Sequence, residues 1–339
     1  MENVGGRGHV TLADVAREAE VSLSTVSKVL NGRSDVSRST RERVEELLRA
    51  YGYQRGTRGG AAPLIEIVFH ELDSLWAMEL IRGVEAVARG NDAGVVVTCS
   101  GTRHAPGPEW IEDVLRRRPM GVVLVFSSLP AQLKRQLRSR AIPFVVIDPA
   151  GDPEADVPSV GSANWAGGLA ATRHLIEQGH RRIGIITGPE DMLCSLARLD
   201  GYRSAMAMAG LEVDPSLIAF GDFHAEGGNA HAKRLLERDD RPSAIFAGSD
   251  LQALGVLDAA RVCGLRVPDD LSVVGYDDLD IAKWTSPALT TVRQPLREMA
   301  EQAAQLILRL REDDTPAPTR LELATTLVVR ASTAPPATA

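Results

Sequence analysis

Cysteine is scarce in this sequence, and long apolar runs are absent. Cys99, Cys194 and Cys263 are the three cysteines among 339 residues, and no two of them form a CxxC pair. This pattern excludes a disulfide scaffold and a cysteine-based zinc site, and it fits a reducing cytosol. No stretch reaches 18 consecutive apolar residues, so no membrane helix is expected, and residues 1–8 lack the apolar core of a signal peptide. We therefore expect a cytoplasmic protein of about two domains.

Signals of catalysis, metal binding or cofactor binding are equally poor. A P-loop and a Gly-x-Ser-x-Gly motif are absent, and no Gly-x-Gly-x-x-Gly motif follows the first predicted strand. His104, His174, His180 and His224 show no spacing typical of metal ligands. Asp277 and Asp278 are adjacent carboxylates, but neighbours in sequence point in different directions and are a weak acid–base signal. We expect no enzyme, no cofactor and no metal.

Charge is distributed unevenly along the chain. The net charge of −7 excludes a wholly basic coat for nucleic acid. Residues 1–60 hold ten Arg and Lys against eight Asp and Glu, whereas the remaining residues hold 28 against 37. A weakly basic head before an acidic body indicates that a polyanionic partner would meet the head.

The head, residues 9–53, is predicted to contain three short helices and no strand. Thr11 precedes apolar residues at helical spacing, and Ser22 and Ser37 can cap a second and a third helix. Asn31-Gly32 should end the second helix, and Gly52 the third. Residues 54–63, rich in Gly and Arg and ending in Pro, are predicted to be a linker.

From Leu64 onward, short apolar runs alternate with amphipathic helical segments, which predicts a doubly wound α/β fold with strands buried on both faces. The predicted strands fall into two groups, at about 64–148 and 182–276, which predicts two lobes with a cleft between them. The runs are Leu64–Phe69, Val95–Cys99, Val122–Phe126, Phe144–Asp148, Ile183–Thr187, Ala244–Ala247 and Leu271–Tyr276. Residues 333–339, rich in Ala, Pro and Thr, are predicted to be a disordered tail.

A helix, the tight turn Glu20-Val21-Ser22 and a second helix form a helix-turn-helix, in which the second helix enters the DNA major groove. Leu23, Ser24 and Lys28 lie on its outer face and can read bases through a thymine methyl contact, a hydroxyl and a donor to guanine. The remaining polar residues are suited to contact phosphate oxygens, through hydroxyl or amide donors and through helix N-termini. They are Thr11, Ser22, Thr25, Ser27, Asn31 and Ser37. The alternative is that these Ser and Thr residues only cap helices or face solvent.

Several strings of the chain resemble the lactose-repressor (LacI) family of bacterial transcription regulators. They are residues 10–31, Val36-Ser37 with Thr40–Val44, 167–175, 179–183, 198–203, 267–278 and Leu289–Val292. The resemblance implies a homodimeric repressor that binds operator DNA, with a body like a periplasmic sugar-binding protein and a small effector held between its lobes. The implied lobes are about 64–162 with 293–322, and 163–292 with 323–332.

The resemblance also implies an effector site, residue by residue. Asp148, Arg198 and Asp277 match polar positions that contact the effector, and Trp76 and Phe223 match aromatic positions that stack on it; Ser249, Cys194 and Leu296 match further pocket positions. Carboxylates, a guanidinium and aromatic faces suit a sugar. On the alternative interpretation Asp277 caps a loop, Arg198 pairs with Asp200, and both aromatic residues belong to the core.

Three departures from the family pattern stand out. Ser249 occupies a position where the family more often has Asn, which has more donors and a longer reach. Glu20 stands where the family usually has Gly, and if this position has a positive φ the Glu would cost about 1 kcal/mol. Residues 54–63 lack the Leu of the family's hinge helix, so we expect little or no hinge helix, with Arg55 and Arg58 left to contact DNA.

The sequence thus predicts a DNA-binding repressor of carbohydrate-utilisation genes that answers to a small sugar or oligosaccharide. A regulator of the same family with a non-sugar effector such as a purine is the alternative. A binding protein without a DNA function is a further alternative suggested by the body alone, and the helix-turn-helix argues against it.

Overall fold

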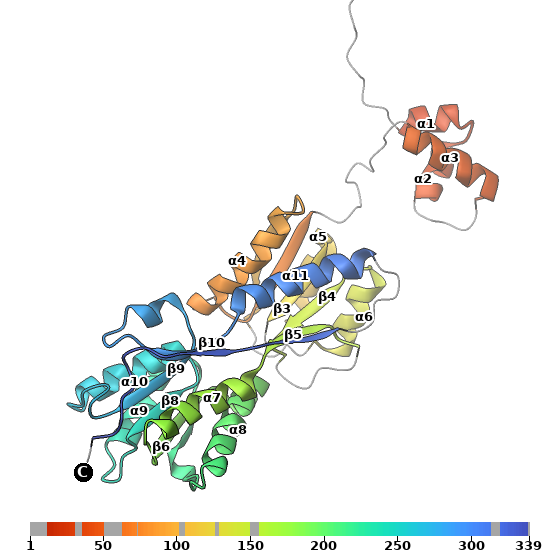
Figure 1. Ribbon diagram of the computed structural model, residues 1–339. Coiled ribbons are helices and arrows are strands. Elements are labelled where there is room, and N and C mark those ends of the chain that lie inside the picture. Colours follow the sequence, from red (N-terminus) through yellow and green to blue (C-terminus); the bar gives the residue numbers. More distant parts are fainter. Residues whose placement is uncertain are drawn as a thin grey trace, which may run out of the picture. The chain divides into compact units, whose positions relative to one another are not determined.

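The computed structural model describes residues 12–30, 36–50, 63–72, 74–101, 106–125, 129–149, 156–312 and 319–337. The chain divides into two compact units, Met1–Ala61 and Ala62–Ala339. Figure 1 shows the small helical unit and the larger α/β unit. The expectations for Thr11, for Asn31-Gly32, for Gly52 and for most of the linker at 54–63 fall outside the described residues.

The small unit is the predicted three-helix head, with α1 (Leu12–Glu18), α2 (Leu23–Leu30) and α3 (Arg38–Ala50). One apolar face of each helix meets the others in a shared core, because apolar residues recur at helical spacing. Val15, Val26 and Val44 are fully buried there.

Glu20 lies in the turn between α1 and α2 and has a φ of 51°. Its backbone N–H donates to the carbonyl of Arg17, and the N–H of Val21 donates to the carbonyl of Ala16. This pair of bonds is the Schellman motif, in which the residue after the helix takes a left-handed conformation that favours Gly. The condition under which Glu20 carries a conformational cost, a positive φ, is therefore met.

The large unit is built on two six-stranded sheets with helices on both faces of each, as the doubly wound prediction requires (Figure 1). The first sheet has the order β11-β5-β4-β3-β1-β2, and the second has the order β12-β10-β9-β8-β6-β7. All neighbouring strands run parallel except β10 and β12, which are antiparallel. The first sheet comprises β1 (Leu64–Phe69), β2 (Gly94–Cys99), β3 (Gly121–Val125), β4 (Phe144–Ile147), β5 (Ser159–Ser162) and β11 (Arg320–Leu323). The second comprises β6 (Ile183–Thr187), β7 (Ile218–Phe220), β8 (Ala244–Ala247), β9 (Ser272–Asp277), β10 (Thr290–Arg293) and β12 (Thr326–Val328).

The helices cover the faces of these sheets in pairs. α4 and α11 pack on one face of the first sheet and α5 and α6 on the other. Likewise α9 and α10 pack on one face of the second sheet and α7 and α8 on the other. The first four are α4 (Leu75–Arg89), α5 (Pro108–Arg117), α6 (Ala131–Ser139) and α11 (Leu296–Glu312). The second four are α7 (Asn164–Glu177), α8 (Leu193–Met208), α9 (Ala225–Leu236) and α10 (Asp250–Val262), and two short 3₁₀ turns are η1 (Pro215–Leu217) and η2 (Asp280–Lys283).

Each predicted apolar run coincides with a strand to within one residue at either end, with Phe126 outside the described residues. The chain passes between the two lobes after β5, after β10 and after β11. Arg293 ends a strand of the second lobe and Leu323 ends a strand of the first, so each differs by one residue from the approximate lobe ranges.

The prediction of disorder from Thr333 onward is wrong for the first residues of the tail. The Thr333 hydroxyl lies 2.9 Å from His174 Nε2, and the backbone N–H of Ala334 donates to the Ser272 hydroxyl. The Ala334 carbonyl lies 3.0 Å from His180 Nε2. The composition of the tail could not predict these partners, because they come from segments far away in the sequence. They form hydrogen bonds with the polar groups of the tail.

A buried carboxylate of the first lobe is paired with an arginine. Glu66 in β1 is fully buried, and Arg117 at the end of α5 donates to both of its carboxylate oxygens at 2.8–3.1 Å. Trp110 Nε1 and the Thr98 hydroxyl also donate to Glu66. The charge of Glu66 is thus compensated by a cation and by hydrogen bonds, as a buried carboxylate requires.

Candidate functional site

The outer face of α2 presents the side chains predicted to read bases. Leu23 is 53% exposed, and Ser24 and Lys28 are also exposed, whereas Val26 and Val29 are buried against the other helices. Ser27 is exposed on the same helix and Thr25 is half-buried. The exposure of Leu23 leaves its side chain free to contact a thymine methyl group.

Ser22 and Ser37 act as helix caps. The backbone N–H of Thr25 donates to the Ser22 hydroxyl at 3.1 Å, and the N–H of Thr40 donates to the Ser37 hydroxyl at 3.2 Å. Both hydroxyls are exposed as well as capping, so the capping role does not remove them from the surface. The two interpretations of these serines are therefore compatible.

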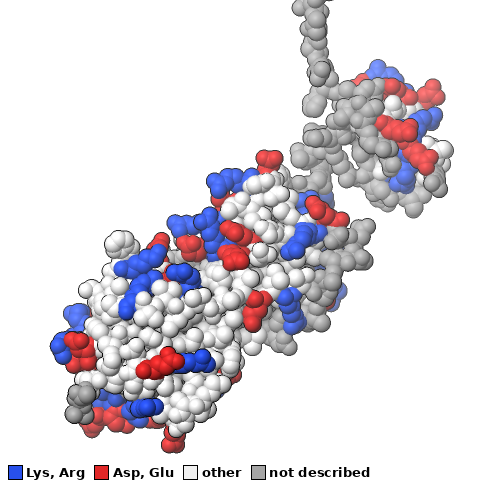
Figure 2. All heavy atoms as spheres, in the orientation of Figure 1, with Lys and Arg blue, Asp and Glu red and all other residues white. Residues whose placement is uncertain are grey.

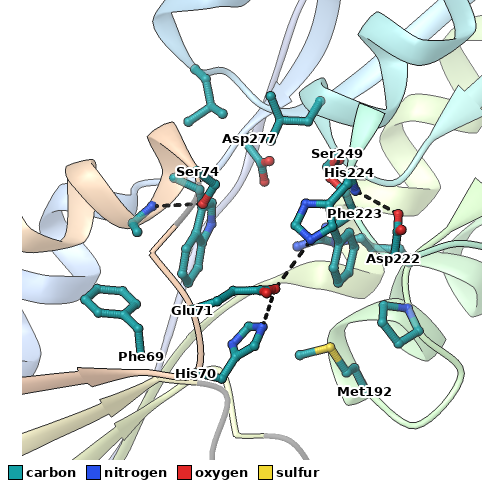
Figure 3. A pocket seen from close by; sticks show the side chains of 16 residues that line it. Phe69, His70, Glu71, Ser74, Met192, Asp222, Phe223, His224, Ser249 and Asp277 are labelled. Carbon is teal, nitrogen blue, oxygen red and sulfur yellow. Dashed lines mark hydrogen bonds and ion pairs between the residues drawn. The ribbon is translucent and has the colours of Figure 1, made fainter. Parts of the chain in front are cut away.

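A pocket lies between the lobes of the large unit, at the carboxyl ends of several parallel strands, where open α/β sheets bind ligands. It holds about 780 Å³ of empty space, part of it open to solvent. Figure 3 shows side chains of both lobes pointing into it. Five of the eight predicted effector residues line it, namely Trp76, Arg198, Phe223, Ser249 and Asp277.

Arg198 on α8 is 3% exposed and is held by several contacts. Its Nε donates to Asn164 Oδ1 at 2.9 Å, and its Nη1 donates to the Gly248 carbonyl at 2.5 Å. The guanidinium carbon lies 3.8 Å from the ring centroid of Tyr276 and 5.4 Å from that of Phe223. A cation this fixed loses little freedom when a ligand arrives. The alternative pairing with Asp200 is wrong, because Asp200 accepts from Arg203.

Asp277 ends β9 and is 6% exposed. Gln294 donates to one of its oxygens at 2.6 Å. Burial raises the pKa of Asp277 to about 7, against the opposing attraction of Arg198 and the bond from Gln294. Its carboxyl group can therefore accept or donate a hydrogen bond near neutral pH, which suits a hydroxyl-rich ligand.

Phe223 and Ser249 form one wall of the pocket. Phe223 has a φ of 70°, and its ring lies over Gly188, where an added Cβ would come within 2.0 Å of the ring. The Ser249 hydroxyl donates to the Phe223 carbonyl and accepts from the backbone N–H of Gln252 at the start of α10. Because these bonds use the hydroxyl, Ser249 supports the wall more than it offers a donor to a ligand.

The structure separates the other three predicted residues from this pocket. Asp148 and Cys194 line a second recess with Asn164 and Trp165, and burial raises the pKa of Asp148 to about 6. Burial also raises the pKa of the Cys194 thiol to about 11. Leu296 is 4% exposed in the core of the first lobe, and it borders a surface depression that also includes Asp277. These three residues therefore do not line the same recess as the other five, although Asn164 of the second recess accepts from Arg198 of the first.

Sequence reasoning missed polar residues at the ends of β1 and β7. His70 and Glu71 follow β1, and Asp222 and His224 follow β7; all four line the pocket. A usable signal existed for the first pair, because polar residues directly after a buried strand lie at the ligand-binding edge of a parallel sheet. β7 has three half-buried residues and was too short to be predicted.

Within the described ranges, no group of three or more His, Cys, Asp or Glu side chains has the arrangement of a metal site. None of the helices in the described part of the chain is long and apolar enough to cross a membrane. Figure 2 shows acidic and basic side chains interspersed over the visible face of the large unit.

Comparisons with known proteins agree with this architecture. The model of the lacI family of bacterial regulatory proteins matches residues 11–56, and that of a periplasmic binding protein-like domain matches residues 172–333. The chain is 37% identical over 340 residues to the HTH-type transcriptional regulator CelR of Thermobifida fusca, covering 96% of this chain and 99% of that one. It is 35% identical over 305 residues to the HTH-type transcriptional repressor CytR of Escherichia coli (strain K12), covering 88% and 89%.

Solved structures give the same result. A complex of the transcriptional regulator CelR with cellobiose has a TM-score of 0.72 and 35% identity, covering 96% of this chain and all of that one. The lac repressor dimer bound to operator and the anti-inducer ONPF has a TM-score of 0.70 and 28% identity, covering 96% and 99%. From its helix-turn-helix head, its two-lobed body and these relatives, the chain belongs to the lacI family of bacterial regulatory proteins and is a DNA-binding transcriptional regulator with an effector domain.

Proposed function

We propose that this regulator is a homodimeric repressor of carbohydrate-utilisation genes that acts in the cytoplasm and binds a small sugar or oligosaccharide between its lobes. The inter-lobe pocket carries this proposal, because it combines a fixed buried cation, Arg198, with the buried carboxyl group of Asp277 and two aromatic walls. Charged groups bind vicinal hydroxyls, and aromatic faces cover the apolar faces of sugar rings. The cellobiose complex of CelR supports the same ligand class.

The effector can be identified by a thermal-shift screen of mono- and oligosaccharides, with purine bases included as the alternative class. A specific ligand binds the native state and raises the unfolding temperature by mass action. Among the hits, a sugar supports the proposal. A shift produced by purines alone would assign the regulator to the alternative effector class.

The role of Arg198 is tested by Arg198→Ala, with Arg203→Ala as a matched control. Arg203 lies on the same helix but is 50% exposed and pairs with Asp200. Arg198→Ala should abolish the effector response and leave operator binding intact, whereas Arg203→Ala should change neither. Loss of operator binding in a folded Arg198→Ala protein would contradict the assigned role.

DNA recognition is tested by fluorescence anisotropy on promoter fragments beside the protein's own gene. Saturable binding that weakens with salt is expected, because Arg and Lys side chains displace counterions from phosphates. Lys28→Ala should relax base preference at a cost of about 1–3 kcal/mol. Sedimentation of the free protein and of the complex tests the dimer, which the lac repressor dimer on its operator supports.

A further inference from the structure

A carboxylate of the first lobe contacts a histidine of the second lobe at one side of the pocket. Glu71 Oε1 lies 2.7 Å from Nε2 of its neighbour His70 and 3.4 Å from Nε2 of His224. Figure 3 shows both imidazole rings directed at the Glu71 carboxylate. Glu71 follows β1 and His224 follows β7, so this contact joins the two sheets.

Both ends of this bridge are held on ordered backbone. His224 is the cap of α9, and its backbone N–H donates to Asp222 Oδ1 at 2.9 Å. The preceding residue, Phe223, is packed over Gly188. On the other side, Glu71 stands two residues after Phe69, which is 2% exposed in the core of the first lobe. A contact between residues this near to the ends of the two strands depends on the distance between the lobes.

Electrostatics favour the charged form of the carboxylate in this position. Partial burial by itself would raise the pKa of Glu71, but the two imidazoles outweigh that effect and hold its pKa below the ordinary value. The side chains of Glu71, His224 and His70 are 46%, 32% and 25% exposed. Solvent therefore reaches the bridge, and this contact, which is an ion pair only when a histidine is protonated, is worth a modest amount.

We propose that Glu71, with His70 and His224, forms a bridge that favours the closed arrangement of the two lobes before any effector binds. These three are positioning residues. A pocket that is already closed requires less rearrangement on binding, so the bridge raises the apparent affinity for whichever effector fits. The inference goes beyond the proposed function, because lobe closure in the free protein does not depend on the identity of the effector.

The test measures the distance between the lobes in the full-length, ligand-free protein. Spin labels are attached through Arg116→Cys on α5 and Arg261→Cys on α10, whose side chains are 76% and 75% exposed. Cys99 and Cys263 are replaced by Ser, and buried Cys194 is kept. Labelled protein is diluted with unlabelled protein so that each dimer carries one labelled chain, and pulsed electron resonance gives the distance distribution.

Glu71→Gln keeps the size and hydrogen-bonding capacity of the side chain but removes its charge. We expect it to lower the ratio of closed to open populations by about 1.5- to 5-fold, the range that a solvent-accessible ion pair supports. His224→Gln should do the same, and the double variant should open no further than either single one, because both remove the same charge–charge interaction. Glu79→Gln is the matched control, since the ion pair of Glu79 is with Arg82 of the same helix, α4.

An unchanged distance distribution in Glu71→Gln would overturn the bridge. So would additive opening in the double variant, or equal opening in Glu79→Gln. A screen that finds no sugar ligand would contradict the proposed effector class but would leave these distances unaffected, so the two failures are distinguishable.

Discussion

Gly168→Ala tests the close packing of α7 against α8, which positions Arg198. A Cβ added at Gly168 would lie 2.3 Å from the carbonyl oxygen of Arg198 and 2.9 Å from its Cα. Both are backbone atoms, so no side-chain rotation can relieve the overlap. The two helices must separate, and Arg198 must move with its own backbone.

The size of the effect follows from two opposing contributions. Overpacking of this kind costs about 1–3 kcal/mol, and Ala in a helix interior gains about 1 kcal/mol over Gly. We therefore expect a net loss of up to about 2 kcal/mol in the free energy of unfolding. Urea denaturation of the full-length protein measures this loss, with the unfolding of the large unit as the observed transition. Because Arg198 shifts, affinity for a sugar found by the screen should fall as well.

Gly90→Ala is the matched control. Gly90 ends α4 with a φ of −66°, and an added Cβ would meet its nearest atoms at 3.6 Å. This variant should be as stable as the original protein or slightly more stable. If Gly168→Ala behaved like Gly90→Ala, the described contact between α7 and α8 would be incorrect.

Three further predictions follow from the structure. Glu20→Gly should stabilise the head by up to about 1 kcal/mol, because Gly adopts a φ of 51° without strain, and slower amide hydrogen exchange in α1 and α2 would show it. Arg117→Ala should lower the free energy of unfolding by about 3 kcal/mol in urea denaturation, because it removes the main counter-charge of buried Glu66. The control Arg116→Ala, at an exposed neighbour, should change it by no more than about 0.5 kcal/mol. Equal effects of the two variants would contradict the buried pair. Burial raises the pKa of Asp148 from 3.8 to about 6, so the folded state binds the proton more tightly and stability should fall as pH rises through that interval. Asp148→Asn should remove that component of the pH dependence and be the more stable protein at pH 7.

The head illustrates how far local sequence signals reach. Ser22 and Ser37 were expected to cap helices, and both accept a backbone N–H at the start of α2 and α3. Capping depends on residues three positions apart, so it can be inferred without tertiary structure. The buried strands were also predictable from local sequence, because β1 and β6 are continuous apolar runs.

The pocket shows where such inference ends. Arg198 and Asp277 were predicted from family resemblance, but their partners Asn164, Gly248 and Gln294 lie 17 to 50 residues away along the chain. The same resemblance placed Asp148 and Cys194 with them, and the fold puts both in a neighbouring recess that shares the Asn164–Arg198 bond. The orientation of α8 is set by its close packing against α7, where Gly168 and Gly201 each meet backbone atoms of the other helix.

The sequence by itself determined the helix-turn-helix head, the two α/β lobes and the family, because periodicity, capping residues and short motifs are local properties. Only the tertiary structure decided which polar side chains converge. Glu71 and His224 are separated by 153 residues in sequence, yet their side chains meet because β1 and β7 end on facing edges of two sheets. Contacts of this kind depend on the packing of whole elements, which no local pattern encodes.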